Sequence, residues 1–541
     1  MASDSRADDL TKRYTGLKSK RAVLETHWQE VTDYMAPWRT DFIRATTPGQ
    51  KRGQFLLDGT AMLASANLGA GLWGMLTNSA QQWFTLRSQI DELNDDYQVK
   101  QWLSDAEAAK RNEFASNGQA FYNKISEFYL DLVIYGTAIF YVEELPGGEI
   151  LFSNRSLSEC VIDENAKEQV DTVIRSFKLT ARQALQKWPK DVSEKIRKAA
   201  QSEPDKEFDF LHAVLPREDF LPGRFDVKGK PVASLYIEME ERKVVEEKGY
   251  RIFPFPVCRW SRIANTPYGA GPGMYALPDA KMLQVMSGTA LDAAEMSAKP
   301  MILAPDEMGF RGIRQRPGEI IYGGMNAQGQ RMYDLMQNGA NHGLTETMLE
   351  RVRIAIREAF HASLLMMVDR ANMTATEVIQ REQEKMRLLG PHMGRVTTEL
   401  HDPLMDIVFD IMARNGRFPE PPDVLKQYPD LKVEYVSPMA RAQRSSEAMA
   451  IDRTLQSITP LIQVNPEVLD NFDIDEMART YADINGVPAK VMKDPKAVQQ
   501  SREQRAQAQQ AQQSAAAMPE MAGAMKDMAL TEKAAAEAQA A

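Results

Sequence analysis

Two clusters of carboxylates are the groups in this sequence whose spacing could support chemistry. One cluster is Asp91-Glu92 with Asp95-Asp96, and the other is Asp470, Asp473 and Asp475-Glu476. Paired carboxylates can hold a divalent metal ion for phosphoryl chemistry. Carboxylates in such clusters are far more often solvated charges in loops and at helix starts. We therefore expect a structural role for both clusters, with metal-dependent catalysis as the alternative.

Other catalytic signatures are missing from the sequence. The six histidines form no H-E-x-x-H pair and no zinc constellation, and the chain has neither a P-loop nor a G-x-S-x-G elbow. The run Gly269–Gly273 is glycine-rich but has no following Lys-Ser/Thr, which favours a turn over a phosphate cradle. Two cysteines, Cys160 and Cys258, make no disulfide framework and indicate a reducing compartment. We expect no catalytic residue, no cofactor and no metal.

The charge balance limits how the protein can meet nucleic acid. Acidic residues outnumber basic ones, 75 to 65, giving a formal net charge of -10. Tight binding to phosphates requires a basic surface, so a firm DNA binder is disfavoured, whereas a protein that DNA passes is not. The most cationic feature is the trio Arg311, Arg314 and Arg316. It is either an exposed loop or a docking site for an acidic or nucleic-acid-associated partner.

The elements that position these residues are mostly helical. The length of 541 residues predicts several structural units. Apolar periodicity and capping signals predict an α+β, predominantly α, chain. The expected helices span 6–35, 58–80, 95–116, 119–135, 278–298 and 345–367, with a kinked helix after 374 and a mixed α/β region at 138–260.

One expected helix carries no charge, because none occurs between Asp58 and Arg87. Polar residues such as Thr60, Ser65 and Asn67 interrupt this stretch, so a lipid-facing span is disfavoured. Its small residues suit close helix packing in an interior or at a subunit contact. The alternative is a membrane-associated structural protein that inserts residues 59–86.

The second long helix, 345–367, has one apolar face. Its apolar residues recur at spacings of three and four, and the length would be about 35 Å. The residues of this face are Leu349, Val352, Ile356, Phe360, Leu364 and Met367.

The order of these elements and three local strings resemble bacteriophage portal proteins, in particular the head-to-tail connector family of short-tailed, T7-like phages. The first string is Thr266–Gly273 leading to Ala276-Leu277-Pro278-Asp279. The second is Met373–Val378 and the third is Val433–Gln443, and the stretch Asp58–Arg87 is also similar. The resemblance covers about residues 5–500.

The resemblance implies a ring, typically of twelve subunits, at one capsid vertex, through which double-stranded DNA is packaged and ejected. It implies as partners the terminase packaging motor, the tail adaptor and tail proteins, capsid and scaffolding proteins, and DNA bound without sequence preference, but no membrane. The protein would belong to the virion after assembly in the bacterial cytoplasm. ATP hydrolysis would then belong to a separate motor. The implied parts are a wing (1–277), stem helices (278–298 and 345–367), a clip (299–324), a tunnel loop (368–374), a kinked wing helix with its return (375–436), a crown (437–498) and a Gln/Ala-rich tail (499–541).

The resemblance also assigns roles to residues. In the tunnel loop, Arg370 and Asn372 are the polar candidates to meet DNA. The arginine trio of the clip becomes a docking site for the motor or the tail adaptor. The apolar face from Leu349 to Leu364 becomes a candidate subunit contact. A packaging ATPase or nuclease with an unrecognised site is the enzymatic alternative.

Overall fold

The structure of the protein is a computed structural model. It describes residues 2–44, 47, 49–115, 121–299, 302–303, 328, 330, 334–335, 342–362, 387–427, 431–435, 450–460, 471–484, 491–492, 497–509, 528 and 531. The chain forms two compact units. The first comprises Met1–Thr85, Ala109–Phe418 and Tyr435–Ala440, and the second comprises Leu86–Ala108, Pro419–Glu434 and Arg441–Ala541. The architecture is α+β and mostly α, as the sequence predicts.

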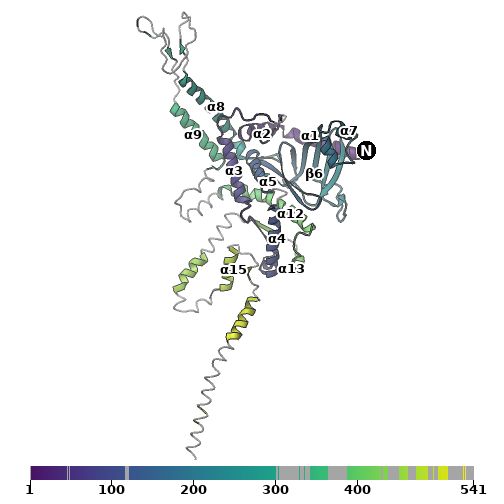
Figure 1. Cartoon of the computed structure of the whole chain (residues 1–541), viewed down its shortest axis with the longest axis vertical. Helices are drawn as coiled ribbons and strands as arrows, with labels where there is room; N and C mark the ends of the chain where they lie inside the picture. The colour runs from purple at the N-terminus through teal and green to yellow at the C-terminus, as the bar shows by residue number, and fades with distance from the viewer. Residues whose placement is uncertain are drawn as a thin grey trace, which may run out of the picture. The chain divides into compact units, whose positions relative to one another are not determined.

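A five-stranded antiparallel sheet in the first unit is covered by helices on both faces (Figure 1). The alternation of side chains in β7 (Val232–Glu238) explains why both faces are covered, since Leu235 and Ile237 point to one face and Tyr236 to the other. One face packs against α1 (Ala2–Lys20) through Leu10, and the other packs against α6 and α7 through Trp188. The strand order is β4 (Cys160–Glu164), β5 (Val170–Thr180), β6 (Glu207–Pro216), β7 (Val232–Glu238) and β8 (Lys243–Tyr250), with α6 (Ala181–Lys187), α7 (Glu194–Ser202) and the short η2 (Val227–Gly229) between strands.

The helix predicted at 6–35 is two helices. α1 ends at Lys20 and α2 runs from Ala22 to Met35. The break lies at Arg21, whose buried guanidinium donates hydrogen bonds to the carbonyls of Leu157 (3.0 Å) and Ser158 (3.1 Å). Burying a charged residue requires such partners, so the chain bends where Arg21 reaches them.

A smaller sheet, ordered β3-β2-β9, packs against α5 (Phe121–Tyr135). Its strands are β2 (Thr137–Glu144), β3 (Ile150–Arg155) and β9 (Val257–Arg259). Aromatic rings fill the space between sheet and helix. Phe121 lies 5.1 Å from Phe152 and Phe128 lies 5.8 Å from Phe140, measured between ring centroids.

Three further helices of the first unit pack against one another: α3 (Thr60–Leu76), α8 (Pro272–Ala298) and α9 (His342–Ala359). α8 begins at Pro272, earlier than the predicted 278, because Gly271 and Pro272 supply its start. α9 ends at Ala359, so the predicted end at Met367 is wrong. His361 has φ 53°, in the left-handed region where a helix cannot continue. The 18 residues of α9 span about 27 Å rather than 35 Å.

The glycine-rich run packs backbone against backbone, which fits the predicted turn. Gly269-Ala270 form β11, which pairs with β10 (Ser261–Arg262), and Gly271 precedes α8. A Cβ on Gly273 would lie 2.5 Å from the carbonyl oxygen of Ile134, at the end of α5. Only glycine therefore allows α8 to start against α5.

The kinked helix that follows residue 387 contains one π-helical turn, η3 (Thr397–His401), before α12 (Asp402–Arg414). This irregularity falls beside Pro403 and fits the kinked helix that the sequence predicts after residue 374. Glu399 of this turn forms an ion pair with Arg259 of β9 at 2.7 Å.

The second unit is built from shorter helices. These are η1 (Asp91–Asp95), the first part of α4 (Tyr97–Ala115), α13 (Asp423–Gln427) and α15 (Ile474–Ile484), and β1 (Phe84–Ser88) pairs with β14 (Leu431–Tyr435). Within this unit, the Trp102 indole donates to the Pro419 carbonyl at 2.9 Å.

Candidate assembly site on the helix pair

α8 and α9 lie side by side (Figure 1). β12 (Ile302–Leu303) pairs antiparallel with β13 (Asp334–Leu335), with Ile302 opposite Leu335. This ladder brings together the two ends of the segment between the helices. The packed helices and this ladder make a helical hairpin.

One glutamine joins this hairpin to the start of α3. The Gln284 side-chain oxygen accepts hydrogen bonds from the backbone amides of Leu57 (2.7 Å) and Asp58 (3.0 Å), and its amide donates to the Asp58 carbonyl (2.6 Å). The Asp58 carboxylate accepts from the Thr60 amide at 2.8 Å and from Arg353 Nε of α9 at 2.9 Å. Three helices are thus held together by a few polar contacts at one point.

The electrostatics keep this junction ionised. Burial acts to raise the pKa of Asp58, but the hydrogen bonds from Thr60 and Arg353 outweigh it, so the pKa lies below its ordinary value. The hydrogen bond to Asp58 also raises the pKa of the Arg353 guanidinium. The pair therefore stays charged and bonded at neutral pH.

The apolar residues predicted as subunit contacts lie mainly inside the chain. Leu349 is 8% exposed, and Ile356 and Phe360 are fully buried. Their side chains pack within a single copy and present no surface to a neighbour, so we reassign them to the core. Val352 is half-buried, and Leu364 lies outside the described residues.

The candidates for DNA and motor contacts, Arg370, Asn372 and the trio Arg311, Arg314 and Arg316, also lie outside the described residues. The two helices that flank the arginine trio in the sequence, α8 and α9, pack against each other. The roles of these five residues remain predictions.

The acidic clusters supply helix caps. Asp96 accepts hydrogen bonds from the amides of Gln98 (2.8 Å) and Val99 (3.1 Å) at the start of α4. Asp473 accepts from the amides of Asp475 and Glu476, both at 3.0 Å, at the start of α15. Within the described ranges, no group of three or more His, Cys, Asp or Glu residues could hold a metal ion.

Two buried side chains that could do acid-base or nucleophilic chemistry are held in unreactive forms. His401 is buried and shares a 3.0 Å hydrogen bond with the Tyr129 hydroxyl, and burial lowers its pKa to about 3. Such an imidazole stays neutral at physiological pH. Cys160 is a free, buried thiol, and burial raises its pKa to about 12, which makes it a poor nucleophile.

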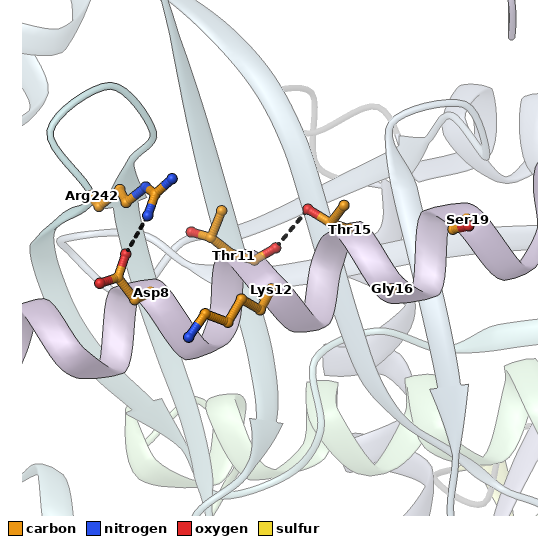
Figure 2. Close-up of a pocket in the computed structure, with 7 residues that line it drawn as sticks. All are labelled: Asp8, Thr11, Lys12, Thr15, Gly16, Ser19 and Arg242. Carbon is orange, nitrogen blue, oxygen red and sulfur yellow. Dashed lines mark hydrogen bonds and ion pairs between the residues drawn. The ribbon is translucent and has the colours of Figure 1, made fainter.

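A hollow of about 410 Å³ runs along one side of α1 (Figure 2). Asp8 of α1 pairs with Arg242 across it at 2.9 Å, and Gly16 has open space where a Cβ would be. The lining contains no histidine or cysteine, and its one carboxylate, Asp8, is held by the ion pair with Arg242. The lining residues are Asp8, Thr11, Lys12, Thr15, Gly16, Ser19 and Arg242.

The charge-free helix proposed as a membrane insertion is α3, which ends at Leu76. Among the residues that the structure places, no helix is both long enough and apolar enough to cross a bilayer.

Comparisons with known proteins place the chain in a family. The family described as bacteriophage head to tail connecting protein matches residues 7–492. The chain belongs to this family. It is 31% identical over 526 residues to the probable portal protein of Bordetella phage BPP-1, covering 94% of this chain and 92% of the relative. It is also 29% identical over 515 residues to the portal protein of Salmonella phage epsilon15, covering 93% and 92%.

The polar junction of Asp58, Gln284 and Arg353 was not predicted from the sequence. The sequence did mark one member of this junction, since Asp58 is the last charged residue before the charge-free stretch. A lone carboxylate at such a boundary caps the helix and needs a cation. No sequence spacing indicated that Arg353 is that cation.

Proposed function

We propose that this protein is a phage portal, the head-tail connector that forms a closed ring at one capsid vertex. The observation that carries the proposal is the family match over residues 7–492, together with near-full-length relatives named portal proteins. The paired helices α8 and α9, with a chain excursion at their end, support it physically. No observation favours a packaging ATPase, a nuclease or a membrane protein.

In the proposed ring, typically of twelve copies, α8 and α9 are the stem and their excursion is the clip. The helices and sheets up to residue 277 form the wing together with the kinked helix, and residues 437–498 form the crown. Repeating a helix pair around an axis builds a tube wall. A closed ring also uses surfaces that a lone copy leaves in water.

The proposed conduit must let a whole genome pass, so its contacts with double-stranded DNA have to be independent of sequence. A net charge of -10 per copy opposes tight phosphate binding. We assign Arg370 and Asn372 of the tunnel loop as the few polar groups that meet the duplex.

The proposed partners follow from the ring's position. The clip arginines dock the terminase motor during packaging and the tail adaptor afterwards, and the wing meets capsid and scaffolding proteins. The protein itself carries out no catalysis, and the motor hydrolyses ATP. Its location is the portal vertex of the virion, with assembly in the bacterial cytoplasm.

Negative-stain electron microscopy of the purified protein tests the proposal. We expect annular particles with a central hole. Uniform single copies at high protein concentration would contradict the proposal. Robust ATP turnover by the protein alone, with Mg²⁺ present, would favour an enzyme instead.

A further inference from the structure

We propose that the outward face of α8 docks onto the outward face of α3 in the next copy. This inference rests on the proposed ring and names the surfaces that close it. The surface on α8, called the outer stripe here, consists of Tyr275, Met282, Val285 and Met296.

α8 is apolar on two opposite faces. Residues such as Ala276, Ala280 and Leu283 are buried against the rest of the unit. The outer stripe lies on the other side of the same helix, at spacings of three, seven and eleven residues that keep one face. Its side chains are exposed, at 55% for Tyr275, 45% for Met282, 70% for Val285 and 45% for Met296.

The neighbouring helix mixes charges with its exposed apolar residues. The outward face of α9 carries Arg351, Arg357 and Glu358, and Arg357 pairs with Glu350 at 3.0 Å. The exposed apolar residues of α9 are Leu344 (59%), Met348 (48%) and Ile354 (45%). The four side chains of the outer stripe are all uncharged and share one face, as expected for a helix that is covered on both sides.

The outer stripe is held in place from behind. Gln284, on the buried face, is bonded to Leu57 and Asp58, which fixes α8 against the preceding segment. The Leu57 side chain, 52% exposed, lies against Gly288 and widens the apolar surface. A surface that is already ordered loses little conformational entropy on docking.

The same chain offers a matching surface. The outward face of α3 contains Leu63, Ala66, Asn67, Ala70 and Gly74, all exposed and uncharged. A Cβ on Gly74 would meet nothing within 4 Å. Small residues leave room for another helix to approach, and the bulky outer stripe can fill that room.

The charges favour a second copy over other occupants. α8 carries Asp279, Lys281, Asp292 and Glu295, a net negative set that does not attract phosphates of nucleic acid. The two faces lie on different helices, so the contact is heterologous. Such contacts join copies head to tail and close into rings when the rotation allows it.

Charge insertion into the outer stripe tests the surface. Val285→Arg or Met282→Arg should raise the protein concentration needed for half-assembly by about tenfold or more, because the contact would have to desolvate a cation. The matched control is Ile354→Arg on the charged face of α9, where Ile354 is also 45% exposed. That variant should assemble like the parent chain. Sedimentation velocity measures assembly, and circular dichroism checks that each variant is folded.

A mixing experiment tests the pairing of faces. Val285→Arg copies keep an intact α3 face, and Ala70→Arg copies keep an intact outer stripe. Neither variant should form rings alone, but their mixture should form dimers through one intact contact and still no rings. If folded Val285→Arg assembles like the parent, or if the mixture stays monomeric, the inference fails. If the parent chain itself forms no ring, the proposed function fails first.

Discussion

At the scale of single residues, the strongest polar interactions lie away from the surface. Arg259 is 3% exposed and pairs with Glu399 at 2.7 Å and Glu164 at 2.8 Å. These contacts tie the π-helical turn to the sheet. A buried ion pair contributes little beyond an apolar replacement of both partners, yet breaking it by removing one partner is costly.

Arg259→Met should therefore destabilise the protein by about 3–5 kcal/mol, because the partly buried carboxylates of Glu399 and Glu164 would both lose their partner. Denaturant unfolding followed by tryptophan fluorescence measures this loss. The control is Arg224→Met, which breaks an exposed pair with Asp226 and should cost less than about 1 kcal/mol. Equal losses of unfolding free energy in both variants would show that the ion pairs of Arg259 contribute no more to stability than an exposed pair.

A buried lysine should make stability depend on pH. Lys110 is fully buried, and its ammonium donates to the Met405 carbonyl at 3.2 Å. Burial lowers its pKa to about 7, with Asp406 partly opposing the shift. Between pH 7 and about 10.4 the unfolded chain binds the proton that the folded chain releases, so this group makes the free energy of unfolding rise with pH.

Lys110→Met should stabilise the protein by about 1–4 kcal/mol at pH 7 and below. The advantage should shrink as the pH rises toward 10. Unfolding midpoints of both proteins at pH 6, 8 and 9.5 check the trend. A stabilisation that grows with pH would contradict the assigned direction of the shift.

The arginine trio carries a prediction about docking. Changing Arg311, Arg314 and Arg316 together to Glu should leave rings intact and weaken binding of the packaging motor, because the charge of the docking surface is reversed. Pull-down of the motor by assembled rings measures this. Loss of the rings themselves would instead assign the trio to the subunit contact.

At the scale of elements, close backbone approach fixes how α8 starts. Gly273→Ala should destabilise the protein by about 1–3 kcal/mol, since its Cβ would lie 2.5 Å from the Ile134 carbonyl oxygen. Gly16→Ala in α1 meets nothing within 4 Å and should stabilise by about 0.5–1 kcal/mol. Thermal unfolding compares the two. A neutral Gly273→Ala would mean that α8 and α5 can move apart freely.

Local sequence signals predicted most of the helices, but they did not predict breaks that depend on tertiary contacts. The helices predicted at 58–80 and 119–135 are present as α3 and α5. The break at Arg21 was missed because its cause is a set of carbonyls more than a hundred residues away. Local periodicity does not encode such partners.

The candidate site was less predictable than the fold. An apolar stripe at helical spacing shows that a face is covered, but not whether the cover is the same chain or a neighbour. That is why Ile356 and Phe360 were expected at a subunit contact and instead lie in the core.

At the scale of the whole molecule, the uncharged faces of α3 and α8 fit the proposed ring. In that proposal, copies join through these two faces, and the hairpin of α8 and α9 serves as one segment of a wall. The proposed function belongs to the closed assembly, because a single copy has no conduit.

The mass of the purified protein in solution tests this claim most directly. Native mass spectrometry should show one closed species, and twelve copies of 60.9 kDa would give about 730 kDa. A discrete ring of another copy number would keep the central claim and change only the count. A species that stays at 60.9 kDa over the whole accessible concentration range would contradict it.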